Sequence, residues 1–354
     1  MSEINSLPII DPLPYLPSSS LLPHVISEVS EIDLAERRKE TAVKIHEACR
    51  DIGFFYLRVD SYLTKSDMDQ ALDLGREFFD RPNGEKESIS LENSDGVRGY
   101  QKLHQNVTQG KADHHEGLDF YAPSPYSPRS PSTPSSSTSN SNGNPRLRPL
   151  EGHNQWPIRP EDFQVKLEKW VEKMKILGNA VMHAMADGLG MNQDEWEELD
   201  GMVDNSFWVM RVIGYPPLPE GADGISCGEH KDYGCLTLLH ADPIPNSLQV
   251  LSPFPSPHWI AAHPIDGCIV VNIGEMWEIW TGGLYPATLH RVIHKSPTYR
   301  VSIPFFYEPN FKAKVKLLDA AKRKAAEEGK EIKEKEQVEY GQFLLGKVSG
   351  NFKY

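Results

Sequence analysis

The sequence predicts a mainly β fold with flanking helices. Between Ser206 and about Pro309, short alternating or apolar runs recur, and Gly, Pro, Asp or Asn interrupts them roughly every 8 to 12 residues. Helical patterns precede and follow this segment instead of alternating with the runs, so an antiparallel sandwich or small barrel is favoured over βα units. The runs are FWVMRVIGY, CLTLLHA, LQVLS, HWIAAHP, CIVVNIG, MWEIWTG, ATLHRVIH and RVSIPFFYE.

Helices are predicted on both sides of this segment. Residues 31–53 and 65–80 have helical apolar spacing, and residues 54–59 between them alternate like a strand. Residues 160–190 predict a longer helix, since one apolar stripe runs along it. Residues 311–337 have the pattern of a charged, solvated helix, and residues 340–349 that of a final docked helix. The stripe consists of Phe163, Leu167, Trp170, Val171, Met174, Leu177 and Val181.

These elements divide the chain into five regions. We expect an N-terminal region of helices and strands over 1–122, a flexible surface insertion over 123–149, a long supporting helix within 150–205, the β-rich core over 206–310 and C-terminal helices over 311–354. Ser, Pro and Asn dominate the insertion, and its few apolar side chains cannot offset the entropy of ordering it.

The composition is that of a globular protein and excludes some partners. The 37 basic and 50 acidic residues give a net charge of −13, which argues against binding nucleic acid or anionic lipid. The apolar runs are too short to span a membrane, and the N-terminus has no export signal. The four cysteines form no CxxC pair, which suggests buried thiols in a reducing compartment. We therefore expect a cytoplasmic protein, acting as a monomer.

Three residues of the β-rich segment have the chemistry of a metal site. His230 and Asp232 in GEHKDYG are two positions apart, so on a strand their side chains would share one face. His290 in ATLHRV, on another expected strand, would complete the set. Two histidines and one carboxylate leave coordination positions open, as in the facial triad of non-haem Fe(II) oxygenases, whereas a structural zinc site closes four ligands.

A candidate carboxylate receptor follows the second histidine. Arg300 and Ser302 in RVSIPFF alternate to one face of a strand, and a guanidinium next to a hydroxyl suits a buried carboxylate. Tyr215 in VIGYPP could add a phenol to the same group. Phe305 and Trp280 are expected in the pocket wall, although ordinary core positions suit both equally well.

At these residues the chain resembles the isopenicillin-N-synthase-like branch of the iron(II)/2-oxoglutarate-dependent dioxygenases, over nearly its whole length. The most specific segments are GEHKDYGCLTLL, LQVL, VVNIGEMWEIWTGG, ATLHRV and RVSIPFFYEPN. The resemblance implies a double-stranded β-helix, or jelly roll, braced by helices. It implies Fe(II) on His230, Asp232 and His290. It also implies that 2-oxoglutarate has its distal carboxylate at Arg300 and Ser302, with Tyr215 assisting.

Some residues depart from the family's pattern. Lys231 stands between the two ligands of the first motif, where a small residue is usual, and strand alternation favours a rim position that faces away from the metal. Arg211 matches an arginine that contacts substrate or co-substrate in some relatives, but it could equally pack on a sheet face. His114 and His115 form a poor competing site, because adjacent side chains on a strand point apart.

The expected activity is therefore oxidation, in most cases hydroxylation, of a small organic molecule by O₂, coupled to decarboxylation of 2-oxoglutarate to succinate. Two alternatives stay open. The first is a non-haem iron oxidase of the same fold that does not use 2-oxoglutarate. The second is a catalytically silent metal-binding or interaction protein. The sequence assigns no particular substrate.

Overall fold

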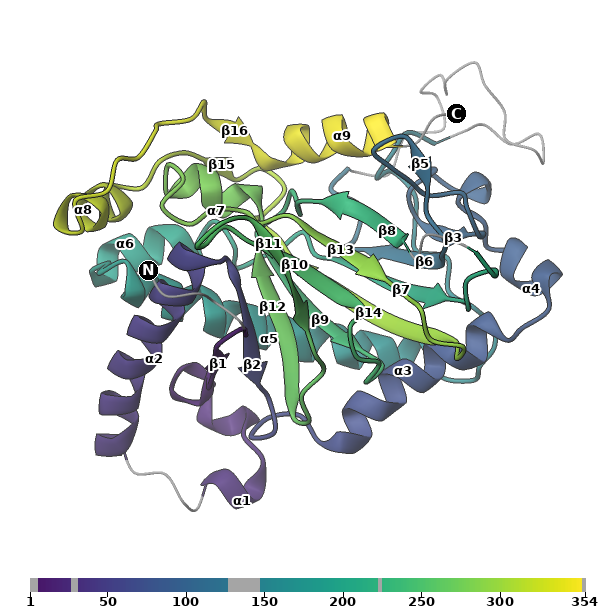
Figure 1. The fold of residues 1–354 in the computed structure, drawn as a ribbon, viewed down its shortest axis with the longest axis horizontal. Coiled ribbons are helices and arrows are strands. Elements are labelled where there is room, and N and C mark those ends of the chain that lie inside the picture. Colours follow the sequence, from purple (N-terminus) through teal and green to yellow (C-terminus); the bar gives the residue numbers. More distant parts are fainter. Residues whose placement is uncertain (1–5, 27–30, 127–146, 222–224, 352–354) are drawn as a thin grey trace.

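Two β-sheets face each other in the computed structural model, which describes residues 6–26, 31–126, 147–221 and 225–351 (Figure 1). Neighbouring strands pair antiparallel, apart from the parallel pair at one edge of the larger sheet. This is the double-stranded β-helix that the resemblance implies. In spatial order, the eight strands of the larger sheet are β1 (Ile9–Ile10), β2 (Phe54–Arg58), β12 (Cys268–Ile273), β9 (Leu236–Ala241), β14 (Arg300–Tyr307), β7 (Val209–Tyr215), β6 (Glu116–Tyr121) and β3 (Gly99–Gln101). The four of the smaller sheet are β11 (His258–Ala262), β10 (Leu248–Ser252), β13 (His290–Ile293) and β8 (Ile225–His230).

Helices and two short hairpins surround the sheets. The hairpins are β4 (Val107–Thr108) with β5 (Lys111–Ala112), and β15 (Lys314–Val315) with β16 (Val338–Glu339). The helices are α1 (Pro23–Ile26), α2 (Glu31–Asp51), α3 (Lys65–Phe79), α4 (Asn83–Glu87), α5 (Phe163–Gly188), α6 (Gln193–Asp200), α7 (Glu275–Trp280), α8 (Asp319–Glu327) and α9 (Tyr340–Asn351). Short 3₁₀ helices occupy Leu13–Tyr15, Ser18–Ser20 and Leu91–Asn93.

Helices α3 and α5 pack against the larger sheet, where they contact β14 (Figure 1). All seven residues of the predicted stripe of α5 are buried. Helix α3 begins with a capping box, in which the Thr64 side chain accepts the Asp67 N–H and the Asp67 carboxylate accepts the Thr64 N–H. These helices hold the outer face of the larger sheet rigid, so that its inner face can carry a site.

The space between the sheets is apolar only in part. Phe54 and Tyr56 of the larger sheet pack with Leu248, Val250 and Ile260 of the smaller one in a separate apolar cluster. Burying this cluster from both sides fixes how the sheets face each other. The candidate site lies elsewhere between the sheets, where charged and polar side chains occur among apolar ones.

Two of the expected elements differ in the structure, and most of one expected region lies outside the described residues. The run MWEIWTG is not a strand: residues 275–280 form α7, with Met276, Trp277, Ile279 and Trp280 buried at helical spacing. The charged stretch 311–337 is helical only over α8, because β15 and β16 pair across it. Of the expected insertion over 123–149, residues 127–146 lie outside the described residues.

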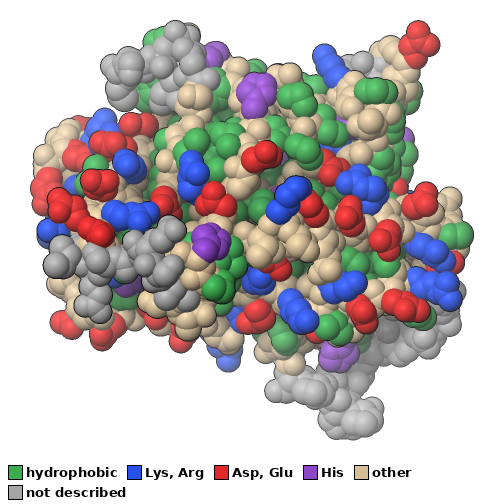
Figure 2. All heavy atoms as spheres, turned by 90° about the horizontal axis from the view of Figure 1, so that it is seen from below, with side chains coloured by type: hydrophobic (Ala, Val, Ile, Leu, Met, Phe, Trp, Pro, Cys, Tyr) green, Lys and Arg blue, Asp and Glu red, His purple; other side chains and the backbone are tan. Residues whose placement is uncertain are grey.

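On the face seen in Figure 2, acidic and basic side chains are interspersed, and neither kind forms a large separate patch. Among the described residues, no helix has the length and apolar character needed to cross a bilayer. Each of the four cysteines is free, and three of them are buried.

One glycine tests how tightly α5 packs on the sheet. A Cβ added to Gly178 would overlap the ring of Tyr307. We expect Gly178→Ala to lower the free energy of unfolding by about 1–3 kcal/mol, because a close-packed interface has no room for a methyl group. Gly84→Ala is the control, since nothing lies within 4 Å of its Cβ. Equal stability of the two variants in denaturant unfolding would contradict this packing.

Candidate active site

The smaller sheet brings two histidines together. His230 ends β8 and His290 begins β13, and the two are direct register partners, with ring centroids 4.2 Å apart. The Nδ1 atom of His230 lies 2.8 Å from the Gly228 carbonyl oxygen, and that of His290 lies 3.2 Å from the Thr288 carbonyl oxygen. A carbonyl oxygen only accepts, so each Nδ1 carries a proton and each Nε2 is the atom that faces a metal. Burial alone would lower the pKa of His230, but Cys227 and Asp232 raise it to about 10, so this ring must release its Nε2 proton when a metal binds.

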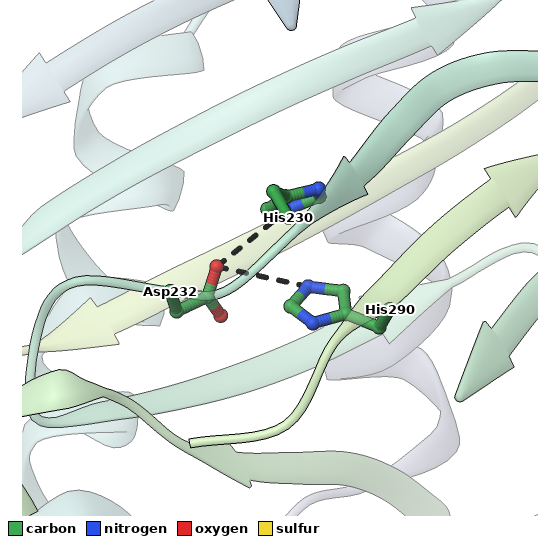
Figure 3. Close-up of side chains that lie close together, drawn as sticks. All are labelled: His230, Asp232 and His290. Atoms are coloured by element: carbon green, nitrogen blue, oxygen red, sulfur yellow. Dashed lines mark ion pairs between the residues drawn. The ribbon is translucent and has the colours of Figure 1, made fainter. Parts of the chain in front are cut away.

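Asp232 meets these two histidines from the turn that follows β8 (Figure 3). Its Oδ1 lies 3.7 Å from the Nε2 atom of each histidine. The sequence predicted a strand position for Asp232, which is wrong, because β8 ends at His230. The chain instead turns toward the larger sheet and carries the carboxylate to it.

The larger sheet holds Asp232 in place. Its Oδ2 accepts hydrogen bonds from Thr237 Oγ1 at 2.5 Å and from Asn272 Nδ2 at 2.7 Å. Thr237 and Asn272 are register partners on β9 and β12. Burial acts to raise the pKa of Asp232, but His290, His230 and these two hydrogen bonds together hold it below its usual value. The carboxylate is therefore ionised and presents Oδ1 to the histidines.

The three residues form a group that could hold a metal ion, and it is the one such group among the described residues. Their potential ligand atoms all lie within 4.8 Å of one another. Burial lowers the pKa of His290 to about 4, so its ring is neutral near pH 7, as a ligand must be. The donor set of two imidazoles and one carboxylate fits Fe(II) with open positions.

A small cavity, here called the inner cavity, adjoins this group. It has a volume of about 80 Å³, and all three metal-ligand candidates line it. Arg300 and Ser302 of β14 line it too, with Tyr215, the register partner of Arg300 on β7. Arg300 is 3% exposed, and its Nε and Nη1 atoms have no hydrogen-bond partner. Buried N–H donors of a cation without partners fit an acidic ligand.

A larger cavity, here called the outer cavity, adjoins His230 and Asp232 but not His290. Its volume is about 390 Å³, and His230, Asp232, Arg211 and Phe306 line both cavities. A ligand in the outer cavity would thus lie next to the same metal as a ligand in the inner one. A third cavity of about 430 Å³ touches Arg300 from the side of α3, and none of the metal-ligand candidates lines it.

The structure decides between the pocket wall and the core for two aromatic residues. Phe305 and Trp280 are fully buried in the main core and line neither cavity. Phe306 lines both cavities instead. Arg300, Ser302, Pro304 and Phe306 share the inner face of β14, and alternation turns Phe305 toward the helices.

Two basic residues of uncertain role now have partners. Arg211 donates to Asp119 Oδ1 at 2.7 Å and lines both cavities, so it is positioned to contact a bound molecule. Lys231 is partly exposed and contacts Glu278 Oε2 at 3.3 Å, which agrees with a rim position. It lines the outer cavity but not the inner one.

Sequence reasoning missed several residues of the site. Thr237 and Asn272 are single polar residues within the apolar runs CLTLLHA and CIVVNIG, and that interruption was the available signal. His115 lines the inner cavity, buried and with Nε2 unpartnered, although its neighbour His114 lies outside and pairs with His104. Glu308, which lines the outer cavity, gave no signal beyond its place after β14.

Comparisons with known proteins agree with this geometry. Residues 204–309 match the model of the 2OG-Fe(II) oxygenase superfamily, and residues 26–159 match that of the non-haem dioxygenase in morphine synthesis N-terminal region. The chain is 37% identical to homoarginine-6-hydroxylase 2-ODD-233 of Oryza sativa subsp. japonica over 312 residues, which cover 87% of this chain and 88% of that protein. It is 36% identical to homoarginine-6-hydroxylase 2-ODD-C23 of Glycine max over 362 residues, covering 99% and 98%.

Solved structures show the same fold. A full-length protein of Neurospora crassa, solved in complex with alpha-KG, superposes with a TM-score of 0.72 at 23% identity, covering 99% of this chain and 98% of that one. JOX2 in complex with 2OG, Fe and JA gives a TM-score of 0.66 at 22% identity, covering 100% and 96%. The family models and the named relatives favour the dioxygenase over the oxidase without 2-oxoglutarate and over the silent scaffold. The chain therefore belongs to the 2OG-Fe(II) oxygenase superfamily, in its isopenicillin-N-synthase-like branch, and is an Fe(II)- and 2-oxoglutarate-dependent dioxygenase that acts on a small molecule.

Proposed function

We propose that His230, Asp232 and His290 bind the Fe(II) of this dioxygenase. The observation that carries this proposal is their convergence, since two of them line both cavities and no comparable group exists among the described residues. Bound Fe(II) would supply O₂ activation at this point. The chain itself orients the three ligands, through the Gly228 and Thr288 carbonyls and through Thr237 and Asn272.

We further propose that the inner cavity receives 2-oxoglutarate. Arg300 would pair with the distal carboxylate, and Ser302 and Tyr215 would hydrogen-bond to it. The guanidinium carbon of Arg300 lies 4.9 Å from the Tyr215 ring centroid, which restricts where the fork of donors points. Arg211 borders both cavities and would contact either the co-substrate or the substrate.

For the substrate, we propose an amino acid with a cationic side chain, of the homoarginine class. Four relatives with 34–37% identity, matched over 87–99% of this chain, are named homoarginine-6-hydroxylases. Of the acidic side chains that line the outer cavity, Glu308 has no ion pair among the described residues, which suits a cationic ligand. In the proposed reaction one oxygen atom of O₂ enters a C–H bond of the substrate as a hydroxyl group. The other enters succinate, and the remaining carbon of 2-oxoglutarate leaves as CO₂.

The cytoplasmic location, the monomeric state and the lack of nucleic-acid and membrane partners stay predictions from composition. The net charge of −13 supports the lack of nucleic-acid and membrane partners, and the free cysteines support the cytoplasmic location.

Removal of a ligand-orienting side chain should weaken metal binding. We expect Asn272→Ala to lower the affinity for Fe(II), or for Mn(II) as a stable substitute, roughly 10- to 100-fold, because Asp232 loses a hydrogen bond that orients it. His290→Ala should lose more. Anaerobic calorimetric titration measures both. Wild-type affinity in His290→Ala would overturn the ligand assignment.

The co-substrate site has its own test. Arg300→Met should raise the KM for 2-oxoglutarate roughly 30-fold or more, because the distal carboxylate would be buried without its cation. Binding of the metal alone should stay unchanged, since Arg300 donates to none of the three ligands. An unchanged KM in a folded variant would exclude Arg300 as the anchor.

The substrate class is tested with the wild-type enzyme. We expect homoarginine to stimulate succinate formation from 2-oxoglutarate in the presence of Fe(II) and O₂, measured by NMR spectroscopy. Arginine, lysine and neutral amino acids serve as the comparison set. Stimulation by neutral compounds alone would refute the proposed class and leave the dioxygenase activity in place.

A further inference from the structure

The charged side chains that line the outer cavity are paired, with one exception. Asp232 belongs to the metal group. The others form four ion pairs at 2.7–3.3 Å: Asp119 with Arg211, Glu229 with Arg291, Lys231 with Glu278, and Lys347 with Glu275. Glu308 has no cationic partner among the described residues. The wall of the cavity therefore carries one carboxylate that no side chain neutralises.

Glu308 is well buried, with 2% of its surface exposed. Its Oε2 accepts the backbone N–H of Cys235 at 2.7 Å. A hydrogen bond from a neutral donor supplies no counter-ion to the ionised carboxylate. Burial, together with the charge of Asp232, raises the pKa of Glu308 well above its usual value, against the hydrogen bond from Cys235 and the effect of the Tyr340 hydroxyl, so the protonated form is favoured while no cation is bound. A bound cation would stabilise the ionised form.

The loop that carries Asp232 is built around this carboxylate. A Cβ on Gly234 would overlap Glu308 Oε1, so the glycine two residues after Asp232 is needed for close approach. Glu308 also continues the inner-face alternation of β14, after Arg300, Ser302, Pro304 and Phe306. Strand β14 and the residue directly after it thus place a guanidinium at the inner cavity and a carboxyl group at the outer one.

We propose that Glu308 binds the guanidinium group of the substrate. This inference rests on the proposed substrate class. In homoarginine, C6 is the carbon bonded to the guanidino nitrogen, and the relatives are named for hydroxylation at position 6. A guanidinium held beside the Asp232 loop would bring the adjacent carbon toward the metal group. A carboxylate can accept two parallel N–H bonds from such a group, which fixes its orientation as well as its place.

The test compares two ligands of similar shape, one cationic and one neutral. Homocitrulline replaces the guanidinium of homoarginine with a neutral urea of nearly equal shape. Their affinities are measured by anaerobic calorimetry on enzyme loaded with Mn(II) and 2-oxoglutarate, so that no turnover is needed. We expect Glu308→Gln to bind homoarginine roughly 30-fold more weakly or worse, and homocitrulline within about threefold of wild type. The glutamine keeps an oxygen for the Cys235 N–H, so the loop is retained.

Glu229→Gln is the matched control, because it removes a carboxylate of the same cavity that Arg291 already neutralises. It should keep the wild-type preference for homoarginine. Glu308→Asp keeps the charge but retracts it by one methylene, so it should weaken homoarginine binding more than homocitrulline binding. This second variant decides the matter if Glu308→Gln does not fold.

The outcomes separate the two proposals. Equal losses for both ligands in Glu308→Gln, or an unchanged preference, would show that Glu308 supports the loop and does not bind the cation. If wild-type enzyme binds neither ligand but turns over other compounds, the substrate class fails, and the role of Glu308 fails with it.

Discussion

The Asp232 carboxylate joins the two sheets, and the candidate site depends on that connection. On the larger sheet, the register pair Thr237 and Asn272 holds Oδ2. On the smaller sheet, the register pair His230 and His290 faces Oδ1. A shift of either sheet by one residue would turn one pair to the opposite face. The candidate metal group therefore depends on packing that lies outside it. The apolar cluster fixes how the two sheets face each other, and helices α3 and α5 support the larger sheet.

Strand β14 carries residues of both cavities that adjoin the candidate metal group. Its inner face carries Arg300 and Ser302 at the inner cavity, and Phe306 where the two cavities adjoin. Its outer face carries Phe305 into the core. The chain then reaches Glu308 at the outer cavity. A rigid strand can hold an anchor for an acid and an anchor for a cation at a fixed separation, which is what a two-substrate oxygenase needs.

Much of the site could be predicted because its residues lie in short local motifs. His230 and Asp232 are two positions apart, as are Arg300 and Ser302, and the structure brings both pairs together with His290 and Tyr215. The prediction was wrong at α7, where a strand was expected, because apolar spacing in a short run does not distinguish a strand from a helix. For Phe305 the sequence left the core and the pocket wall open, and the direction in which alternate residues of β14 face places it in the core.

By itself, the sequence determined the fold class and predicted the metal-binding residues and the carboxylate receptor, because each depends on residue types at fixed local spacing. The tertiary structure alone decided which other residues belong to the site. Thr237, Asn272 and His115 come from separate strands or their ends, and their roles follow from strand pairing far apart in the sequence. The lack of an ion pair at Glu308 could not be predicted either, because it depends on where the folded chain places its cationic side chains.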